Sequence, residues 1–285
     1  MSTESCTSRN RAIYTRTKFQ SYQPGVTNDS VRRDADRCTI VLDVSCDDLK
    51  LTDLLLTHLP SYNPIGDVKK ANSNADTNLE LYRMDTFECA AIMYNLGYRC
   101  LVLNFASDFV AGGGWRRDNC IAQEECLCRS SDLGYRLENR DVVRYPWHKN
   151  TAVWTPNVHV YANSTSHAID VPFWCDVISI AAIRQPFHTT FDKYNAADKA
   201  LMLAKIEAVY RVATITHANC VIAGAFGCGV FGHIPENVAV LFKEVMAKYP
   251  MIKTVFAIID GRRTTNFDVF SKILNAKEAP PPQYE

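Results

Sequence analysis

The sequence predicts an α/β protein: a three-layer α/β/α sandwich around one mixed central sheet, preceded by an N-terminal extension. Two observations predict this fold class. Short apolar runs typical of buried strands alternate with amphipathic helical patterns over about 190 residues, which is the pattern of layered α/β folds. The chain has 285 residues, enough to bury one large core, and no internal repeat or linker divides its larger part.

Composition and charge narrow the function classes. Hydrophobic residues make up 47% of the chain and charged residues 22%, which is typical of a soluble globular protein. Lys plus Arg equals Asp plus Glu, at 31 each, so the chain lacks the basic excess of a nucleic-acid-binding protein. We therefore expect no strong nucleic-acid interaction.

Cysteine usage and apolar runs indicate the compartment. The eleven cysteines form no CxxC pair, and neither they nor the seven histidines show metal-ligand spacing, so we expect no metal site. Scattered unpaired cysteines are typical of a reducing compartment. With no signal-peptide pattern and no apolar run of membrane-spanning length, we expect a soluble intracellular monomer, in the cytoplasm or nucleus.

The predicted domain organisation has three parts. Residues 1–78 form an extension packed on the core, with residues 1–10 disordered and one candidate strand at 40–44. Residues 79–275 form the core, and the proline-rich residues 276–285 form a disordered tail. The role of the extension stays open at this stage.

The core begins with a β-α-β pattern. Residues 79–84 alternate like a strand, and Asp85 then precedes a helical pattern that Gly97 ends. Residues 99–106 form a near-continuous apolar strand interrupted by Asn104. Such a unit predicts two neighbouring parallel strands buried on both faces. The buried Asn104 amide must find a partner, either loop backbone or a ligand hydroxyl.

A glycine triplet and an acidic cluster follow this strand. The glycines are Gly112, Gly113 and Gly114, and the cluster is Gln123, Glu124 and Glu125. Glycines permit close approach of backbone or ligand, and paired carboxylates suit acid/base chemistry. The alternative is a plain turn followed by solvated acids at the start of a helix predicted over 122–133. In open α/β sheets, ligands bind at the carboxyl ends of strands, which favours a site here.

The remaining elements continue the alternation. Residues 135–154 are expected to be irregular. Strands are predicted at 157–163, 177–183, 219–226 and 253–259, and helices at 197–216, from Pro235 onward, and at 266–274.

A second glycine-rich loop lies between the strand at 219–226 and the helix at Pro235. Its residues are Gly227, Cys228, Gly229, Val230, Phe231 and Gly232. They match G-x-G-x-x-G in the strand-to-helix context of a pyrophosphate-binding turn. A Rossmann dinucleotide site is disfavoured because the loop comes late in the chain and no acidic residue follows about 20 positions on. A ligand-free tight turn is the other alternative, and Phe231 either packs inward or stacks on a sugar or base.

The run VLNFASDFVAGGG…AQEECLCRSS resembles the signature of the microbial (bacterial-type) poly(ADP-ribose) glycohydrolases (PARGs), members of the macrodomain superfamily. Three further segments agree in order: NVHVYAN, VPFWCDVISIAAIRQP and IAGAFGCGVFGHIPENVAVLF. The likeness spans residues 79–274. It departs from the family at Ala111, where relatives often have Pro, and at Asp118 and Asn119, where they often have a small residue.

The resemblance implies a macrodomain-like fold and a role for each motif. It implies that Glu125 is catalytic and that Glu124 and Gln123 support substrate placement. It places the triglycine against the ribose and phosphates, and the loop at 227–232 on the diphosphate. Phe231 would orient the distal ribose, and Asn104 matches the Asn of the strand that leads to the triglycine.

The implied activity is hydrolysis of the ribose–ribose O-glycosidic bond of poly(ADP-ribose), from chain ends, releasing ADP-ribose without a cofactor. The substrate would be the polymer or ADP-ribosylated protein. Two alternatives stay open: a hydrolase of mono-ADP-ribosyl linkages on protein, nucleic acid or O-acetyl-ADP-ribose, and a non-catalytic ADP-ribose-binding macrodomain. The pair of acids favours an enzyme over a reader. A nicotinamide-dependent dehydrogenase rests on G-x-G-x-x-G alone.

Overall fold

The structure is a computed structural model that describes residues 39–45, 78–165, 167–186, 188–190, 193–261 and 264–280. The predictions for residues 1–38 and for most of the loop before residue 78 lie outside the described residues. Within the described part, no helix is long and apolar enough to cross a membrane.

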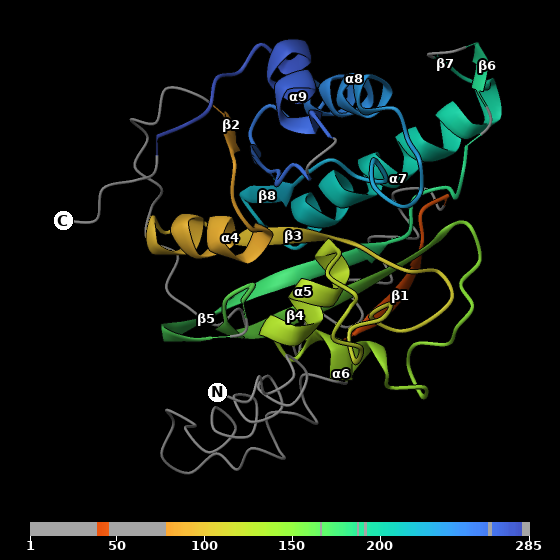
Figure 1. The fold of residues 1–285 in the computed structure, drawn as a ribbon. Helices are drawn as coiled ribbons and strands as arrows, with labels where there is room; N and C mark the ends of the chain where they lie inside the picture. The colour runs from red at the N-terminus through yellow and green to blue at the C-terminus, as the bar shows by residue number, and fades with distance from the viewer. Residues whose placement is uncertain are drawn as a thin grey trace.

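One seven-stranded mixed sheet forms the centre of the molecule (Figure 1). Its strand order is β1-β4-β5-β3-β8-β9-β2, with β5, β3, β8, β9 and β2 parallel and β4 antiparallel to both β1 and β5. The strands are β1 (Ile40–Asp43), β2 (Leu79–Tyr82), β3 (Cys100–Phe105), β4 (Thr151–Ala162), β5 (Ala168–Ile180), β8 (Cys220–Ala223) and β9 (Lys253–Ala257). A separate two-stranded sheet joins β6 (His188–Thr190) to β7 (Lys193–Tyr194). The mixed α/β fold class is thereby confirmed.

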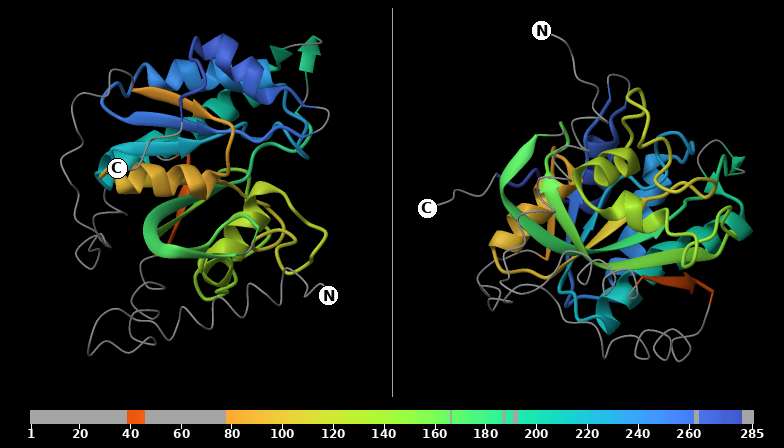
Figure 2. Two further views of the ribbon diagram at one scale, coloured as in Figure 1. Left: turned by 60° about the vertical axis from the view of Figure 1, so that its left-hand side comes forward. Right: turned by 90° about the horizontal axis from the view of Figure 1, so that it is seen from below.

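Helices cover both faces of the sheet (Figure 2). One face carries α4 (Thr86–Asn95), α5 (Gln123–Ser130) and α6 (Leu133–Leu137), and the other carries α7 (Ala196–Ile215), α8 (Pro235–Met246) and α9 (Asn266–Leu274). Because side chains alternate along a strand, β3 sends Leu101 and Leu103 into the core under α7–α9 and Cys100 and Val102 into the core under α4–α6. A strand buried on both faces therefore reads as an unbroken apolar run.

The predicted pairing of the first two core strands is wrong. β2 pairs in parallel with β9 at the edge of the sheet, and β8 and β9 lie between β2 and β3. Burial explains the difference, because β8 and β9 are buried at every position whereas β2 has half-buried Leu79 and Glu80. Fully buried strands occupy the interior of the sheet, and the half-buried strand is left at its edge.

The longest strands and one helix end also differ from the prediction. β4 and β5 each extend well beyond the predicted 157–163 and 177–183, since Pro156 lies in a register shift between Thr155 and Val158 that interrupts the alternation. The region 135–154 is not wholly irregular, because it holds most of α6 and the start of β4. The helix expected over 122–133 ends at Ser130, because Ser131 is extended and bridges to Val160.

Both ends of the described chain join the sheet. β1, from the region expected to be an extension, pairs antiparallel with β4. Glu278 bridges to Leu81, and Ala279 N–H donates to the Leu81 carbonyl at 2.9 Å. The first residues of the tail predicted to be disordered therefore pack beside β2.

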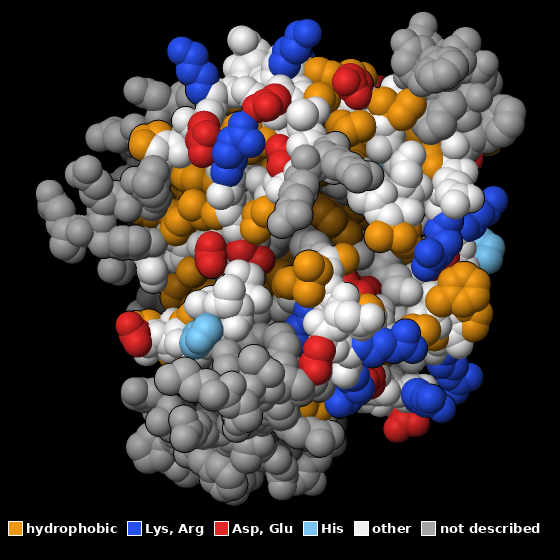
Figure 3. All heavy atoms as spheres, in the orientation of Figure 1, with side chains coloured by type: hydrophobic (Ala, Val, Ile, Leu, Met, Phe, Trp, Pro, Cys, Tyr) orange, Lys and Arg blue, Asp and Glu red, His pale blue; other side chains and the backbone are white. Residues whose placement is uncertain are grey.

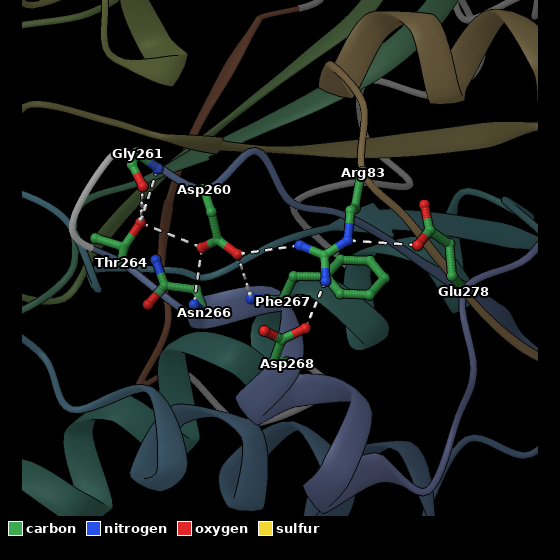
Figure 4. A network of polar contacts seen from close by, with 8 residues as sticks. All are labelled: Arg83, Asp260, Gly261, Thr264, Asn266, Phe267, Asp268 and Glu278. Atoms are coloured by element: carbon green, nitrogen blue, oxygen red, sulfur yellow. Dashed lines mark hydrogen bonds and ion pairs between the residues drawn. The ribbon is translucent and has the colours of Figure 1, made fainter.

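A polar network ties the β2 edge together (Figure 4). The Arg83 guanidinium lies 3.8 Å from the Phe267 ring centroid and pairs with Asp268 and with two other carboxylates, Asp260 at 3.4 Å and Glu278 at 3.3 Å. Asp260 also accepts backbone N–H groups in the first turn of α9, including that of Phe267 at 3.2 Å. Asp260 thus caps the start of α9.

Candidate active site

The two glycine loops leave neighbouring strands at the same edge of the sheet. β3 and β8 are parallel and adjacent, with Cys100 opposite Cys220 and Val102 opposite Ile222. Their carboxyl ends therefore lie side by side. Phe105 is the last residue of β3 and Phe226 follows β8, and their ring centroids lie 5.6 Å apart. Segments about 110 residues apart in sequence are thereby brought to one place, as two halves of one site require.

The triglycine lies directly on the carboxyl groups of α5. Gly113 has a φ of +57°, and a Cβ at this position would lie 2.5 Å from Glu125 Oε1 and 3.1 Å from Glu124 Oε2. The Gly114 N–H donates to Glu125 Oε1 at 2.9 Å. A Cβ on Gly114 would meet Cys120 Sγ at 2.5 Å. Only glycines allow this approach, so the sequence pattern has a direct structural cause.

Glu125 lies in the first turn of α5, half-buried beneath the glycine loop. The N-cap residue Ala122 offers no side-chain acceptor, so the free N–H groups of this turn are left to other acceptors. A helix N-terminus also favours negative charge nearby.

Glu124 occupies a different environment although it is the next residue. Its side chain is only 3% exposed, and its carboxyl accepts the Ser107 N–H at 2.7 Å and the Asn104 amide at 3.3 Å. Burial is the main cause that raises the pKa of Glu124 to about 8. The nearby Glu125 acts in the same direction, and the two hydrogen bonds act in the opposite direction. At neutral pH the Glu124 carboxyl is therefore mostly protonated.

Gln123 and Asn104 attach α5 to β3. The Gln123 side chain accepts the Phe105 N–H at 2.8 Å and donates to the Leu103 carbonyl at 2.9 Å. Asn104 is fully buried, and its amide nitrogen donates to Ser179 Oγ at 2.9 Å as well as to Glu124. Both side chains thus set the position of the helix that carries the acids. This arrangement favours a positioning role over direct substrate contact.

The raised pKa of Glu124 predicts a pH dependence of stability. Because the folded-state pKa lies above the ordinary value of 4.5, the folded chain holds this proton more tightly than the unfolded chain. The resulting stabilisation is complete below pH 4.5 and is lost as pH rises to about 8. In Glu124→Gln this loss is absent. As pH rises from 4.5 to about 8, we expect the free energy of unfolding of the wild type to fall relative to that of the variant. The difference changes by at most about 1.4 kcal/mol per pH unit.

Denaturant unfolding of both proteins at pH 5, 7 and 9 measures this difference. Gln keeps the shape of the side chain and its capacity to accept the Ser107 N–H, so folding is preserved. Parallel pH profiles for the two proteins would contradict the assignment of the raised pKa to Glu124.

The second glycine loop is more open. Gly227 has a φ of +79°, and its Cβ position lies 2.5 Å from His233 Cδ2. A Cβ on Gly229 or Gly232 would meet no atom of the described residues within 4 Å. Gly232 also has a positive φ, of +76°. Two of the three glycines therefore leave space that neighbouring side chains do not fill. Such space is what a bound diphosphate would occupy.

The other residues of this loop divide between core and surface. The Cys228 thiol donates to the Phe226 carbonyl at 3.8 Å, and burial raises the pKa of the thiol. Val230 is exposed, while the half-buried Phe231 packs against the hydrophobic cores of both sheet faces. If Cys228 contacts substrate, it does so through its backbone.

Several residues of this site were missed by the sequence reasoning. Ser107 and Asp108 directly follow β3, and His233 directly follows the glycine loop, so adjacency to a motif was a usable signal for them. The His233 ring donates to the Ile183 carbonyl at 2.6 Å and contacts the Tyr194 hydroxyl. Arg184, whose contacts are described below, lies in the segment VPFWCDVISIAAIRQP, and the resemblance of that segment to the family was the available signal for it.

Comparisons with known proteins agree with this geometry. Residues 48–174 match the family described as "Microbial-type PARG, catalytic domain". No curated protein sequence matches the chain significantly.

Solved structures share the fold. PARG from Thermomonospora curvata superposes with a TM-score of 0.67 at 21% identity, over 94% of this chain and 98% of that one. The same enzyme bound to the inhibitor ADP-HPD gives 0.68 at 19% identity, with the same coverage. PARG from Deinococcus radiodurans in complex with ADP-ribose gives 0.63 at 20% identity, over 90% of this chain and 99% of that one. Residues 48–174 are thus similar to the catalytic domain of microbial-type PARGs, and the chain shares its fold with two bacterial PARGs.

Proposed function

We propose that this chain hydrolyses the ribose–ribose O-glycosidic bond of poly(ADP-ribose) from chain ends and releases ADP-ribose. One observation carries the proposal: the Glu125 carboxyl lies 2.9 Å from the Gly114 N–H, at the sheet edge where both glycine loops emerge. Relatives of the same fold hold ADP-ribose or ADP-HPD, which supports the same ligand class here. The site thus combines a proton-handling group with a loop suited to a diphosphate.

Glu125 is the proposed general acid and base. Its carboxyl gives a proton to the departing ribose oxygen as the glycosidic bond breaks through an oxocarbenium-like transition state. The carboxylate then removes a proton from the water that attacks the anomeric carbon, which returns Glu125 to its acid form. The Gly114 N–H stabilises the carboxylate between these steps, since a backbone donor is strongest toward a charged acceptor.

Glu124 supports Glu125 in this proposal. The buried Glu124 is mostly neutral at pH 7. As a neutral acid it can also donate a hydrogen bond to a ribose hydroxyl. Gln123 and Asn104 hold the helix that carries both acids.

The second loop is proposed to hold the substrate. Gly227, Cys228, Gly229, Val230 and Gly232 would present backbone N–H groups to the diphosphate, and the Phe231 ring would orient the distal ribose. Gly112 and Gly113 would approach the ribose. We propose a reaction without cofactor or metal, by a monomer of the cytoplasm or nucleus.

Incubation of the purified chain with poly(ADP-ribose), and separately with mono-ADP-ribosylated protein, tests the proposal. Chromatography should detect free ADP-ribose from the polymer, with monomer rather than oligomer as the first product. Binding of ADP-ribose without release from either substrate would favour a reader. Release from the mono-ADP-ribosylated protein alone would favour a hydrolase of that linkage.

A further inference from the structure

The segment that follows β5 is attached to the second glycine loop by its backbone. The Gln185 N–H donates to the Phe231 carbonyl at 2.9 Å, and the Ile183 carbonyl accepts from the His233 ring at 2.6 Å. Gln185 has a φ of +46°, a left-handed conformation that is costly for a residue with a Cβ. The backbone on either side of Arg184 is therefore fixed relative to the loop at 227–232.

The Arg184 side chain reaches from this segment to the first glycine loop. Its Nε donates to Asp108 Oδ1 at 2.7 Å, and its Nη2 lies 2.5 Å from the same oxygen. Its guanidinium lies 4.4 Å from the ring centroid of Phe231 and 5.4 Å from that of Phe109. In Figure 3, basic and hydrophobic side chains lie side by side at the right-hand edge, over the loop that follows β3 in Figure 1.

Asp108 is in turn connected to the acids. It follows Ser107, whose N–H binds Glu124, and the next residues lead into the triglycine, where the Gly113 N–H donates to the Val110 carbonyl at 3.0 Å. A displacement of Asp108 would therefore be passed to both glutamates. Through Arg184, the same displacement would reach the Phe231 ring.

We infer that Arg184 is a positioning residue that fixes the spacing between the two glycine loops and the orientation of the Phe231 ring. This inference rests on the proposed function, because the spacing matters when one ligand contacts both loops. A guanidinium over an aromatic face and an ion pair with Asp108 each contribute modestly when partly exposed. Together they connect the segment after β5 to the segment that leads into the triglycine. The described residues show no other ion pair between these two segments.

Two variants separate positioning from direct contact. Arg184→Ala removes the guanidinium. Asp108→Asn leaves the charge of Arg184 in place and removes only the carboxylate that pairs with it. If Arg184 acts by positioning the two loops, both variants lose activity. If Arg184 instead binds the diphosphate directly through its charge, only Arg184→Ala loses activity. Arg184→Lys keeps a charge for Asp108 but loses the flat face over Phe231, so its effect should be intermediate.

The control is Lys248→Ala. Lys248 pairs with Glu207, and this ion pair is about as exposed as the pair of Arg184 with Asp108. The side chains of Lys248 and Glu207 are 46% and 28% exposed, and those of Arg184 and Asp108 are 41% and 25% exposed. The melting temperature of each variant shows whether it folds. Activity changes that exceed those of the control then report on the site.

Each variant is assayed for turnover of poly(ADP-ribose) and titrated with ADP-ribose by calorimetry. We expect Arg184→Ala and Asp108→Asn to lower kcat/KM and ADP-ribose affinity by about ten-fold each, with part of the loss in kcat. Wild-type kinetics in Asp108→Asn, or Arg184→Ala indistinguishable from Lys248→Ala, would overturn the inference. A wild type that binds ADP-ribose without turnover would sink the proposed function alone, because the titrations still test Arg184.

Discussion

Glu125→Gln should lower kcat for poly(ADP-ribose) by about 10²- to 10⁴-fold, the range that general acid–base catalysis supplies. The amide cannot give a proton to the departing ribose oxygen, nor can it activate water. It retains an oxygen that accepts the Gly114 N–H, so the glycine loop keeps its place. ADP-ribose affinity, measured by calorimetry, should change by less than about three-fold.

Glu207→Gln serves as the matched control, since Glu207 pairs with Lys248 on the surface. It should turn over polymer at the wild-type rate. Retention of turnover in Glu125→Gln would remove Glu125 from the acid/base role. A variant that loses ADP-ribose binding as well would show that the side chain mainly holds the loop.

Gly113→Ala should lower turnover by about 10²-fold and destabilise the fold. The new Cβ would lie 2.5 Å from Glu125 Oε1, and the backbone at this position has a φ of +57°. The left-handed conformation alone costs an L-residue about 1–2 kcal/mol. The clash also moves a reacting carboxyl, and a displacement of about 1 Å costs on the order of 10²-fold in rate. Thermal unfolding and polymer turnover measure the two effects separately.

Gly261→Ala is the comparison for this variant. Among the described residues, an added Cβ at Gly261 would meet only Thr264 Oγ1, at the ordinary distance of 3.7 Å. We expect both its melting temperature and its turnover to stay close to the wild-type values. Gly113→Ala with wild-type turnover would mean that the triglycine and Glu125 are not in contact in the working enzyme.

Elements with a local signal were predictable from the sequence. Residues 266–274 form α9 as expected, because Phe267 and Phe270 recur at helical spacing on the buried side. Asp85 caps α4 through the N–H groups of Phe87 and Glu88, as its position before the helical pattern indicates. Strand order was not predictable in this way. The pairing of β2 with β9 depends on contacts between residues about 170 positions apart, which periodicity does not encode.

The site residues also fall into two groups, those that the sequence identifies and those that only the fold identifies. The triglycine and the acids of α5 could be identified because their residue types are unusual at that spacing. The difference between Glu124 and Glu125 could not, since adjacent residues of one type look alike until burial separates them. Arg184 lies in a segment that resembles the family, but nothing in that segment singles out this arginine. Its importance comes from a loop that only the folded sheet brings near Asp108.

The edge strand β2 has a consequence for synthesis. In the described sheet its hydrogen-bonded partner is β9, and Arg83 just after it pairs with Asp260, Asp268 and Glu278. The ribosome synthesises these partners more than 170 residues after β2. The strand therefore has no partner to pair with while the middle of the chain emerges. The glycine loops and acids leave the ribosome before β9 does. Closure of the β2 edge is therefore one of the last steps in assembling the sheet that carries them.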